Sequence, residues 1–158
     1  MVKPVEPGCD LEAVYREHGP TLWRSLYAYT GGRRDVADDA TAEAFARALA
    51  APDRIRDAVP WLYRVAYRIA AAEMRRDQNR GEMTDIAAEA PSDATLEVLA
   101  ALRRLSPTQR AAAYLHYQAD RPVAEVAQLL GTSTAAVKVH LFRARKRLRV
   151  LLEEDGDG

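Results

Sequence analysis

Basic side chains crowd one stretch of the sequence, where their types and spacing suit contact with phosphates. From Lys138 to Arg149 the chain reads KVHLFRARKRLR and contains no Asp or Glu. Ammonium and guanidinium groups bind phosphate oxygens, and Arg can also donate two parallel hydrogen bonds to a guanine edge. The stretch therefore indicates DNA contact, against the plainer alternative of a solvated basic helix. The candidate residues are Thr134, Lys138, His140, Phe142, Arg143, Arg145 and Lys146.

The apolar residues around this stretch predict the element that holds it. Between Val137 and Leu151 they recur at helical spacing on one stripe, which leaves the basic residues outside. A shorter helical pattern precedes it, and Gly131 can end that first helix because glycine adopts a positive φ at little cost. Ser133 or Thr134 can then cap the second helix. A short helix, a tight turn and a long basic helix over residues 122–152 predict a helix-turn-helix that reads a major groove.

A second candidate lies in the helix that Pro60 opens, where two stripes run side by side. At 100° per residue Tyr63 and Tyr67 share one stripe, and Arg64 and Arg68 share the next. Aromatic rings stack on unpaired bases while guanidinium groups bind the phosphates, which suits single-stranded nucleic acid. The alternative on this helix alone is that the tyrosines are core and the arginines form a solvated face. The candidate residues are Tyr63, Arg64, Tyr67, Arg68, Arg75 and Arg76.

A third group is acidic and lies on the helix predicted over residues 36–50. Asp38 and Asp39 are adjacent, so on a helix their carboxylates point about 100° apart, which argues against a shared catalytic task or Mg²⁺ site. No glycine-rich phosphate loop or Ser/His/Asp arrangement accompanies them. A protein-docking edge or a solvated face is the better interpretation. The candidate docking residues are Asp38, Asp39, Glu43 and Phe45.

The cysteine and histidine content narrows the class of function. A single cysteine, Cys9, excludes an internal disulfide and a cysteine-based metal site. His18, His116 and His140 have no Cys or His partner at ligand spacing. We therefore expect no metal, no cofactor and no catalytic residue, so the protein is not predicted to be an enzyme.

Charge is sorted along the chain although it sums to zero. The 158 residues carry 23 Lys and Arg against 23 Asp and Glu, yet residues 81–96 hold acids and no base. No apolar run approaches the roughly 18 residues of a membrane span, and the first residues lack the apolar centre of a signal peptide. We expect a cytoplasmic protein without a membrane partner.

The remaining signals predict an all-α fold. Asp10 can cap a first helix that weakens at Gly19 and Pro20, and Asp35 can cap the acidic helix. Ser106 opens the sequence SPTQ, a capping box with Pro at the first helical position. No strand alternation appears. We predict two small helical domains on a flexible acidic linker, with boundaries at 10–80, 81–93 and 94–153.

Taken together, these segments resemble the extracytoplasmic-function (ECF) group of bacterial sigma-70-type sigma factors, which carry only regions 2 and 4. Residues 35–49, DVADDATAEAFARAL, resemble the region-2 segment AED-LVQ-ETF-RA. Residues 61–76, WLYRVAYRIAAAEMRR, resemble the WL-RIA-N-A-D-LRR stretch. Residues 102–152 resemble region 4 nearly end to end, from LRRLSPTQR to FRARKRLRVLL.

The resemblance implies a role for each candidate group. The acidic helix would dock on the β′ clamp helices of RNA polymerase core, and the Tyr/Arg helix with its preceding loop would bind the melted −10 strand. The last helix would read −35 promoter DNA, while the apolar groove of region 4 grips the β flap. An anti-sigma factor is a further partner that such proteins often have. The function implied is promoter-specific transcription initiation.

Some positions depart from the family pattern, so the promoter sequence does not transfer with the resemblance. Ala42 stands where the family usually has Gln, Arg68 where an Asn often contacts a flipped base, and Glu73 where Asp is usual. In the last helix, residues 134–136 (TAA) replace a small-Gly-Thr start, and His140 replaces a frequent Arg. Two alternatives stay open: a helix-turn-helix regulator that acts without polymerase core, and a sigma-derived protein-interaction adaptor.

Overall fold

The computed structural model describes residues 10–80 and 100–156, and these contain helices and no strand, as the all-α prediction requires. The predicted linker, residues 81–93, and the helix start predicted near Ala94 lie outside the described residues. The elements are α1 (Leu11–Tyr29), α2 (Arg34–Ala50), the 3₁₀ turn η1 (Pro52–Arg54), α3 (Ala58–Arg80), α5 (Pro107–Ala113), the π turn η2 (Tyr114–Gln118), α6 (Val123–Leu130) and α7 (Thr134–Gly156).

Helix α1 continues without interruption through Gly19 and Pro20, where the sequence predicts that it weakens. Asp10 caps the helix as predicted, because its carboxylate accepts two backbone hydrogen bonds of the first turn. Pro20 has no backbone N–H, so the helix lacks one hydrogen bond at this position. Because Pro20 lies on the exposed side, that bond is lost at the solvent face. Leu22 and Leu26 are only 1% and 0% exposed. Their burial offsets the roughly 3 kcal/mol that an interior proline costs.

Helix α2 begins at Arg34 with Arg33 in the cap position, so Asp35 lies in the first turn and does not cap it. This corrects the predicted cap. The Asp35 carboxylate instead accepts a hydrogen bond from Arg33 Nη2 at 2.7 Å and lies near the positive end of the helix dipole. Partial burial acts to raise the pKa of Asp35, but the hydrogen bond from Arg33, the charge of Arg33 and the backbone hydrogen bonds together outweigh it, so the pKa lies below its ordinary value.

Arg33 also forms an ion pair with Asp77 near the end of α3. Only 15% of the Arg33 side chain and 12% of the Asp77 side chain are exposed, so the pair is largely enclosed. One guanidinium therefore fastens the start of α2 to the end of α3.

Alanines let the first three helices approach closely. Ala37, Ala40, Ala44 and Ala48 of α2 are all 0% exposed, and α2 packs against both α1 and α3. Small side chains on these faces bring three backbones together and hold the outer faces of α2 and α3 in fixed positions.

The capping box predicted at Ser106 is confirmed. The Ser106 Oγ accepts a hydrogen bond from the Gln109 N–H, and the Gln109 Oε1 accepts one from the Ser106 N–H, each at 3.1 Å. Helix α5 then passes into the π turn η2, which closes with the Ala119 N–H donating to the Tyr114 carbonyl oxygen at 3.0 Å.

The predicted helix-turn-helix is also present. Gly131 ends α6 at φ +66°, and the Thr132 N–H donates to the Ala127 carbonyl oxygen at 3.0 Å. The Ser133 Oγ then accepts a hydrogen bond from the Ala136 N–H at 3.1 Å and caps α7. Local turn chemistry thus sets the geometry of the motif.

Replacing Gly131 with alanine should lower the free energy of unfolding by about 1 kcal/mol, because an L-residue is strained at this φ. A Cβ there would lie 3.7 Å from the Arg64 side chain, an ordinary contact, so the cost is conformational. Urea denaturation of Gly131→Ala measures it. Gly131→Asn should cost less, since Asn tolerates the left-handed region. Equal losses for both variants would point to a steric cause instead.

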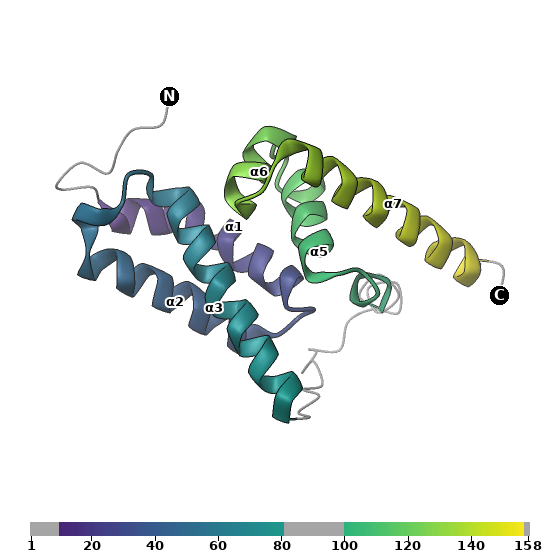
Figure 1. The fold of residues 1–158 in the computed structure, drawn as a ribbon, viewed down its shortest axis with the longest axis horizontal. Helices are drawn as coiled ribbons and strands as arrows, with labels where there is room; N and C mark the ends of the chain where they lie inside the picture. The colour runs from purple at the N-terminus through teal and green to yellow at the C-terminus, as the bar shows by residue number, and fades with distance from the viewer. Residues whose placement is uncertain (1–9, 81–99, 157–158) are drawn as a thin grey trace.

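The helices on both sides of the undescribed segment pack together (Figure 1). Helix α1 contacts α5, and α3 contacts α6. Leu26 and Leu62 of the first part belong to the same buried cluster as Ala112, Leu115 and Val126 of the second. The two predicted domains therefore share one apolar core in this structure.

Candidate nucleic-acid interface

Helix α7 divides cleanly into a buried stripe and an open basic face. Val137, Leu141 and Ala144 are 0–3% exposed and pack inward, as the periodicity predicted. The opposite side is exposed and includes Phe142, at 59%. Thr134 begins the helix, and the exposed side chains of its outer surface include the candidates Lys138, Phe142, Arg143, Arg145 and Lys146.

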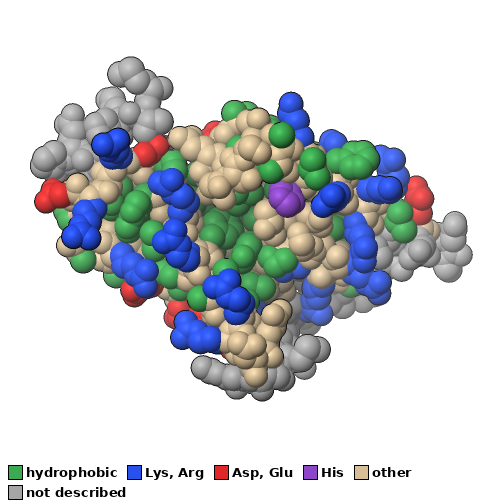
Figure 2. Space-filling model, viewed as in Figure 1, with side chains coloured by type: hydrophobic (Ala, Val, Ile, Leu, Met, Phe, Trp, Pro, Cys, Tyr) green, Lys and Arg blue, Asp and Glu red, His purple; other side chains and the backbone are tan. Residues whose placement is uncertain are grey.

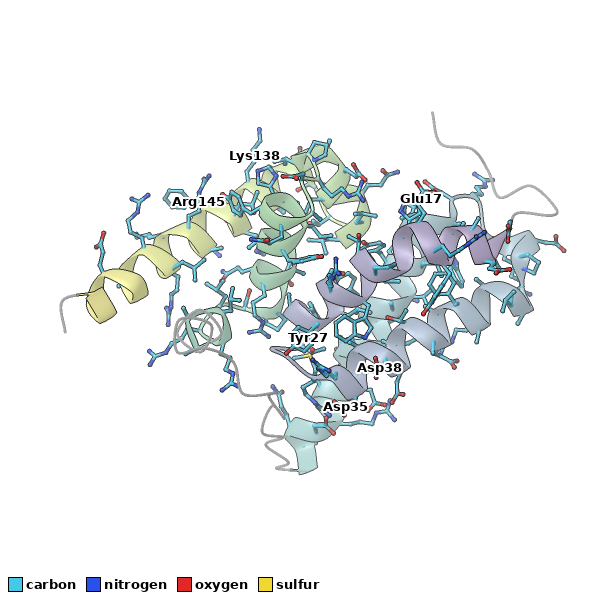
Figure 3. The ribbon with its side chains drawn as sticks, turned by 180° about the vertical axis from the view of Figure 1, so that it is seen from behind. Glu17, Tyr27, Asp35, Asp38, Lys138 and Arg145 are labelled. Carbon is cyan, nitrogen blue, oxygen red and sulfur yellow. The ribbon has the colours of Figure 1, made fainter. Side chains whose placement is uncertain are left out.

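Two candidate residues of this helix, Arg145 and His140, differ from the freely exposed ones. Arg145 Nη1 donates a hydrogen bond to the Tyr117 hydroxyl at 3.1 Å, which holds its guanidinium beside η2 (Figure 3). His140 is half-buried, and its Nδ1 is enclosed with no hydrogen-bond partner among the described residues. His140 therefore belongs to the flank of the open face, whereas Arg143 and Lys146 lie at its centre.

Helix α3 presents its arginines but not its tyrosines. Arg64, Arg68, Arg75 and Arg76 are all exposed. In contrast, Tyr63 is 2% exposed. The arginine stripe thus lies where the sequence predicts it.

The aromatic stripe is turned inward. The Tyr67 hydroxyl is enclosed, and its ring packs edge-to-face on Tyr29 of α1, with centroids 4.9 Å apart. Burial raises the pKa of both Tyr63 and Tyr67. In this arrangement the tyrosines and arginines do not form one open surface, because α1 and the second helical part cover the tyrosine side of α3.

The candidate docking residues on α2 differ in their exposure. Asp38, Asp39 and Glu43 are exposed, and Trp23 Nε1 of α1 donates a hydrogen bond to Asp38 at 2.7 Å. Phe45 is 8% exposed, and its ring packs edge-to-face against Tyr15 with centroids 5.0 Å apart, so in this structure Phe45 lies in the core and not beside the exposed acids.

The exposed face of α2 carries acidic side chains beside small and basic ones. Glu43 forms an exposed ion pair with Arg47 at 3.0 Å, and Ala42 and Ala46 lie exposed beside it. In Figure 3, Asp35 and Asp38 of α2 lie far from Lys138 and Arg145 of α7. The labelled acids of α2 therefore lie apart from the labelled basic residues of α7.

Basic side chains gather on one face of the molecule. Figure 2 shows Lys and Arg over the part of the face where α3 runs and again over α7. Phosphates are the ligands that such surfaces favour, so both helices can meet a nucleic-acid backbone from the same side.

Sequence reasoning missed Arg110, which is 7% exposed. Its guanidinium donates to the carbonyl oxygens of Ala28 and Tyr29, at the end of α1, and of Leu105. Burial lowers the pKa of Arg110. The available signal was its position: it begins the apolar run RAAAYL with no acid nearby to pair with it.

The described residues contain no group of three or more His, Cys, Asp or Glu placed to hold a metal ion. Within the same residues, no helix has the length and apolar character needed to cross a membrane.

Comparison with known proteins identifies both helical parts. Residues 14–81 match the family Sigma-70 region 2, and residues 95–148 match Sigma-70, region 4. The chain is 32% identical over 161 residues to the ECF RNA polymerase sigma factor SigL of Mycobacterium tuberculosis, covering 92% of this chain and 90% of SigL. It is 31% identical over 159 residues to the ECF RNA polymerase sigma factor BldN of Streptomyces coelicolor, covering 90% of this chain but 60% of BldN.

A solved structure shares the fold. The sigma factor RpoE of Bartonella quintana, crystallised with the anti-sigma factor NepR, matches with a TM-score of 0.75 at 22% identity, over 91% of this chain and 97% of that one. With both conserved regions present in order, and a relative matched along nearly its whole length, the chain belongs to the sigma-70 family, in its ECF group.

Proposed function

We propose that this chain directs RNA polymerase core to promoters and assists strand opening there. The observation that carries the proposal is the exposed basic face of α7, set on a capped helix-turn-helix in a chain that matches both sigma regions. The exposed arginines of α3 supply a second surface for DNA phosphates.

Each surface then has one task. The acidic face of α2, centred on Asp39 and Glu43, docks on the β′ clamp helices. Helix α3 holds the melted −10 strand through Arg64 and Arg68, and α7 reads −35 DNA while the apolar side of region 4 meets the β flap. The boundaries that go with these tasks are 10–80 for region 2, 81–93 for the linker and 94–153 for region 4.

The chain performs no chemistry of its own in this proposal. Its charged groups bind and position DNA and polymerase in the cytoplasm, and the polymerase makes the phosphodiester bonds. The complex of Bartonella RpoE with NepR supports an anti-sigma factor as a further partner of this chain.

One experiment tests the whole proposal. The chain is mixed with bacterial RNA polymerase core, and open-complex formation and run-off transcripts are measured on a promoter library. We expect sequence-selective initiation that core alone does not give. Absence of core binding would overturn the proposal in favour of an independent regulator. Core binding without initiation on any template would favour an adaptor.

Arg143 should determine one base of the −35 element. It lies exposed at the centre of the open face of α7, so Arg143→Ala should cost about 1–3 kcal/mol on the preferred −35 sequence and much less on others. Binding of the holoenzyme to a panel of −35 variants measures this. Arg149→Ala, further along the helix and nearer its flank, serves as control and should weaken all sequences equally. A uniform loss for Arg143→Ala would assign it to a phosphate.

A further inference from the structure

Arg110 joins the two helical parts through hydrogen bonds. Its Nε donates to the Ala28 carbonyl oxygen and its Nη2 to the Tyr29 carbonyl oxygen, both at 2.7 Å. Its Nη1 donates to Leu105 in its own part at 2.6 Å. One planar guanidinium thus bonds groups on both sides of the undescribed segment.

The site that receives Arg110 is electrostatically suited to a cation. The last carbonyl groups of a helix lack partners within the helix and carry its negative dipole end. Helix α1 has no basic residue in its own last turn. Arg110 therefore supplies from region 4 the charge that α1 lacks, in a place where only 7% of the residue remains exposed.

The same packing covers part of α3. Tyr63 is 2% exposed, and Tyr114 of η2 and Arg121 and Glu125 of region 4 lie near enough to shift its pKa. The Arg64 side chain lies 3.7 Å from the point where a Gly131 Cβ would be, so the turn of the helix-turn-helix rests against α3. The exposed guanidinium groups remain outside this contact.

We propose that Arg110 is a latch between region 4 and region 2, and that it holds the free chain in a closed state in which Tyr63 cannot stack on an unpaired base. The second half of this inference rests on the proposed role of α3 in binding the −10 strand. In the closed state α3 offers phosphate contacts without base stacking. Release of Arg110 from the end of α1 lets α6 leave α3 and completes the strand-binding surface.

The closed state is tested first by distance. Dyes are attached to Asp53→Cys on η1 and Arg147→Cys on α7, both exposed positions, in a Cys9→Ser background. Single-molecule energy transfer on the free chain should show one dominant compact population. A dominant extended population would overturn the latch without any further variant.

Arg110→Gln should then lower the closed-to-open ratio by about tenfold or more, because two interdomain hydrogen bonds from a charged donor are lost. Arg103→Gln, an exposed arginine of region 4, is the matched control and should leave the ratio unchanged. Circular dichroism checks that α5 still folds. If α5 does not fold, Arg110→Lys is used instead, because lysine keeps the positive charge but lacks the planar guanidinium that donates to several carbonyl groups. An unchanged ratio in the folded variant overturns the latch.

Strand binding is measured separately with fluorescent oligo(dT). Apparent affinity is the intrinsic affinity reduced by the competent fraction, so Arg110→Gln should bind about tenfold more tightly. Loss of a positive charge alone would weaken binding, so a gain cannot come from charge. A changed distance without tighter binding would overturn the occlusion of α3 while leaving the latch and the transcription assay untouched. Tighter binding with no promoter-dependent transcript would support occlusion and count against the sigma function.

Discussion

Replacing Asp77 with alanine should lower the free energy of unfolding by about 3 kcal/mol, the lower end of the range for breaking a buried ion pair. The change leaves the Arg33 guanidinium, whose side chain is 15% exposed, without its partner on α3. Asp35 still accepts one hydrogen bond from Arg33, which keeps the loss from being larger. Urea denaturation followed by circular dichroism measures the effect.

Two comparisons make the Asp77 result specific. Glu43→Ala breaks an exposed ion pair with Arg47, whose side chains are 51% and 55% exposed, and should cost no more than about 0.5 kcal/mol. The double change Arg33→Met with Asp77→Leu removes both charges and should recover most of the stability. If Asp77→Ala lowered the free energy of unfolding only as little as Glu43→Ala does, the enclosed ion pair would contribute no more stability than the exposed one.

Reversing the acidic face of α2 should abolish assembly with RNA polymerase core. Asp39→Lys with Glu43→Lys places two cations where the proposal requires a basic partner surface, and like charges across an interface cost several kcal/mol. We expect affinity for core to fall by about 100-fold or more. Fluorescence anisotropy of the labelled chain against core measures it.

The matched control reverses the same number of charges elsewhere. Glu12→Lys with Glu17→Lys changes α1, where Figure 3 places Glu17 well away from Asp38, and should alter affinity by no more than about threefold. Both variants must retain the helical circular dichroism of the parent. Equal losses in the two variants would indicate a net-charge effect, and no loss in the α2 variant would remove α2 as the docking surface.

Features fixed by neighbouring residues were predictable from the sequence. The capping box at Ser106, the turn at Gly131 and the buried stripe of α7 all follow from interactions within a few residues. The exposed basic face of α7 follows from the same stripe, because a helix that buries one side exposes the other.

Features fixed by distant packing were not predictable in this way. The tyrosines of α3 share a stripe that could face water or protein. Tyr63 faces protein because helices far along the chain pack over it. Pro20 signalled an end, yet burial of the leucines after it held α1 together. The role of Arg110 does not show in the sequence, because two of the carbonyl groups that bind it lie on another helix.

In the π turn η2, the number of residues matters more for the structure than which residues they are. It fits one residue more than an α-helical turn would, between α5 and the helix-turn-helix. Deleting one residue from Tyr114–Gln118 would remove the extra residue of this turn and shift the chain that leads into α6. Substitutions at the exposed Gln118 leave the number of residues in the turn unchanged. Insertions and deletions here should therefore be tolerated far less than exchanges, because they would redirect the reading face of α7.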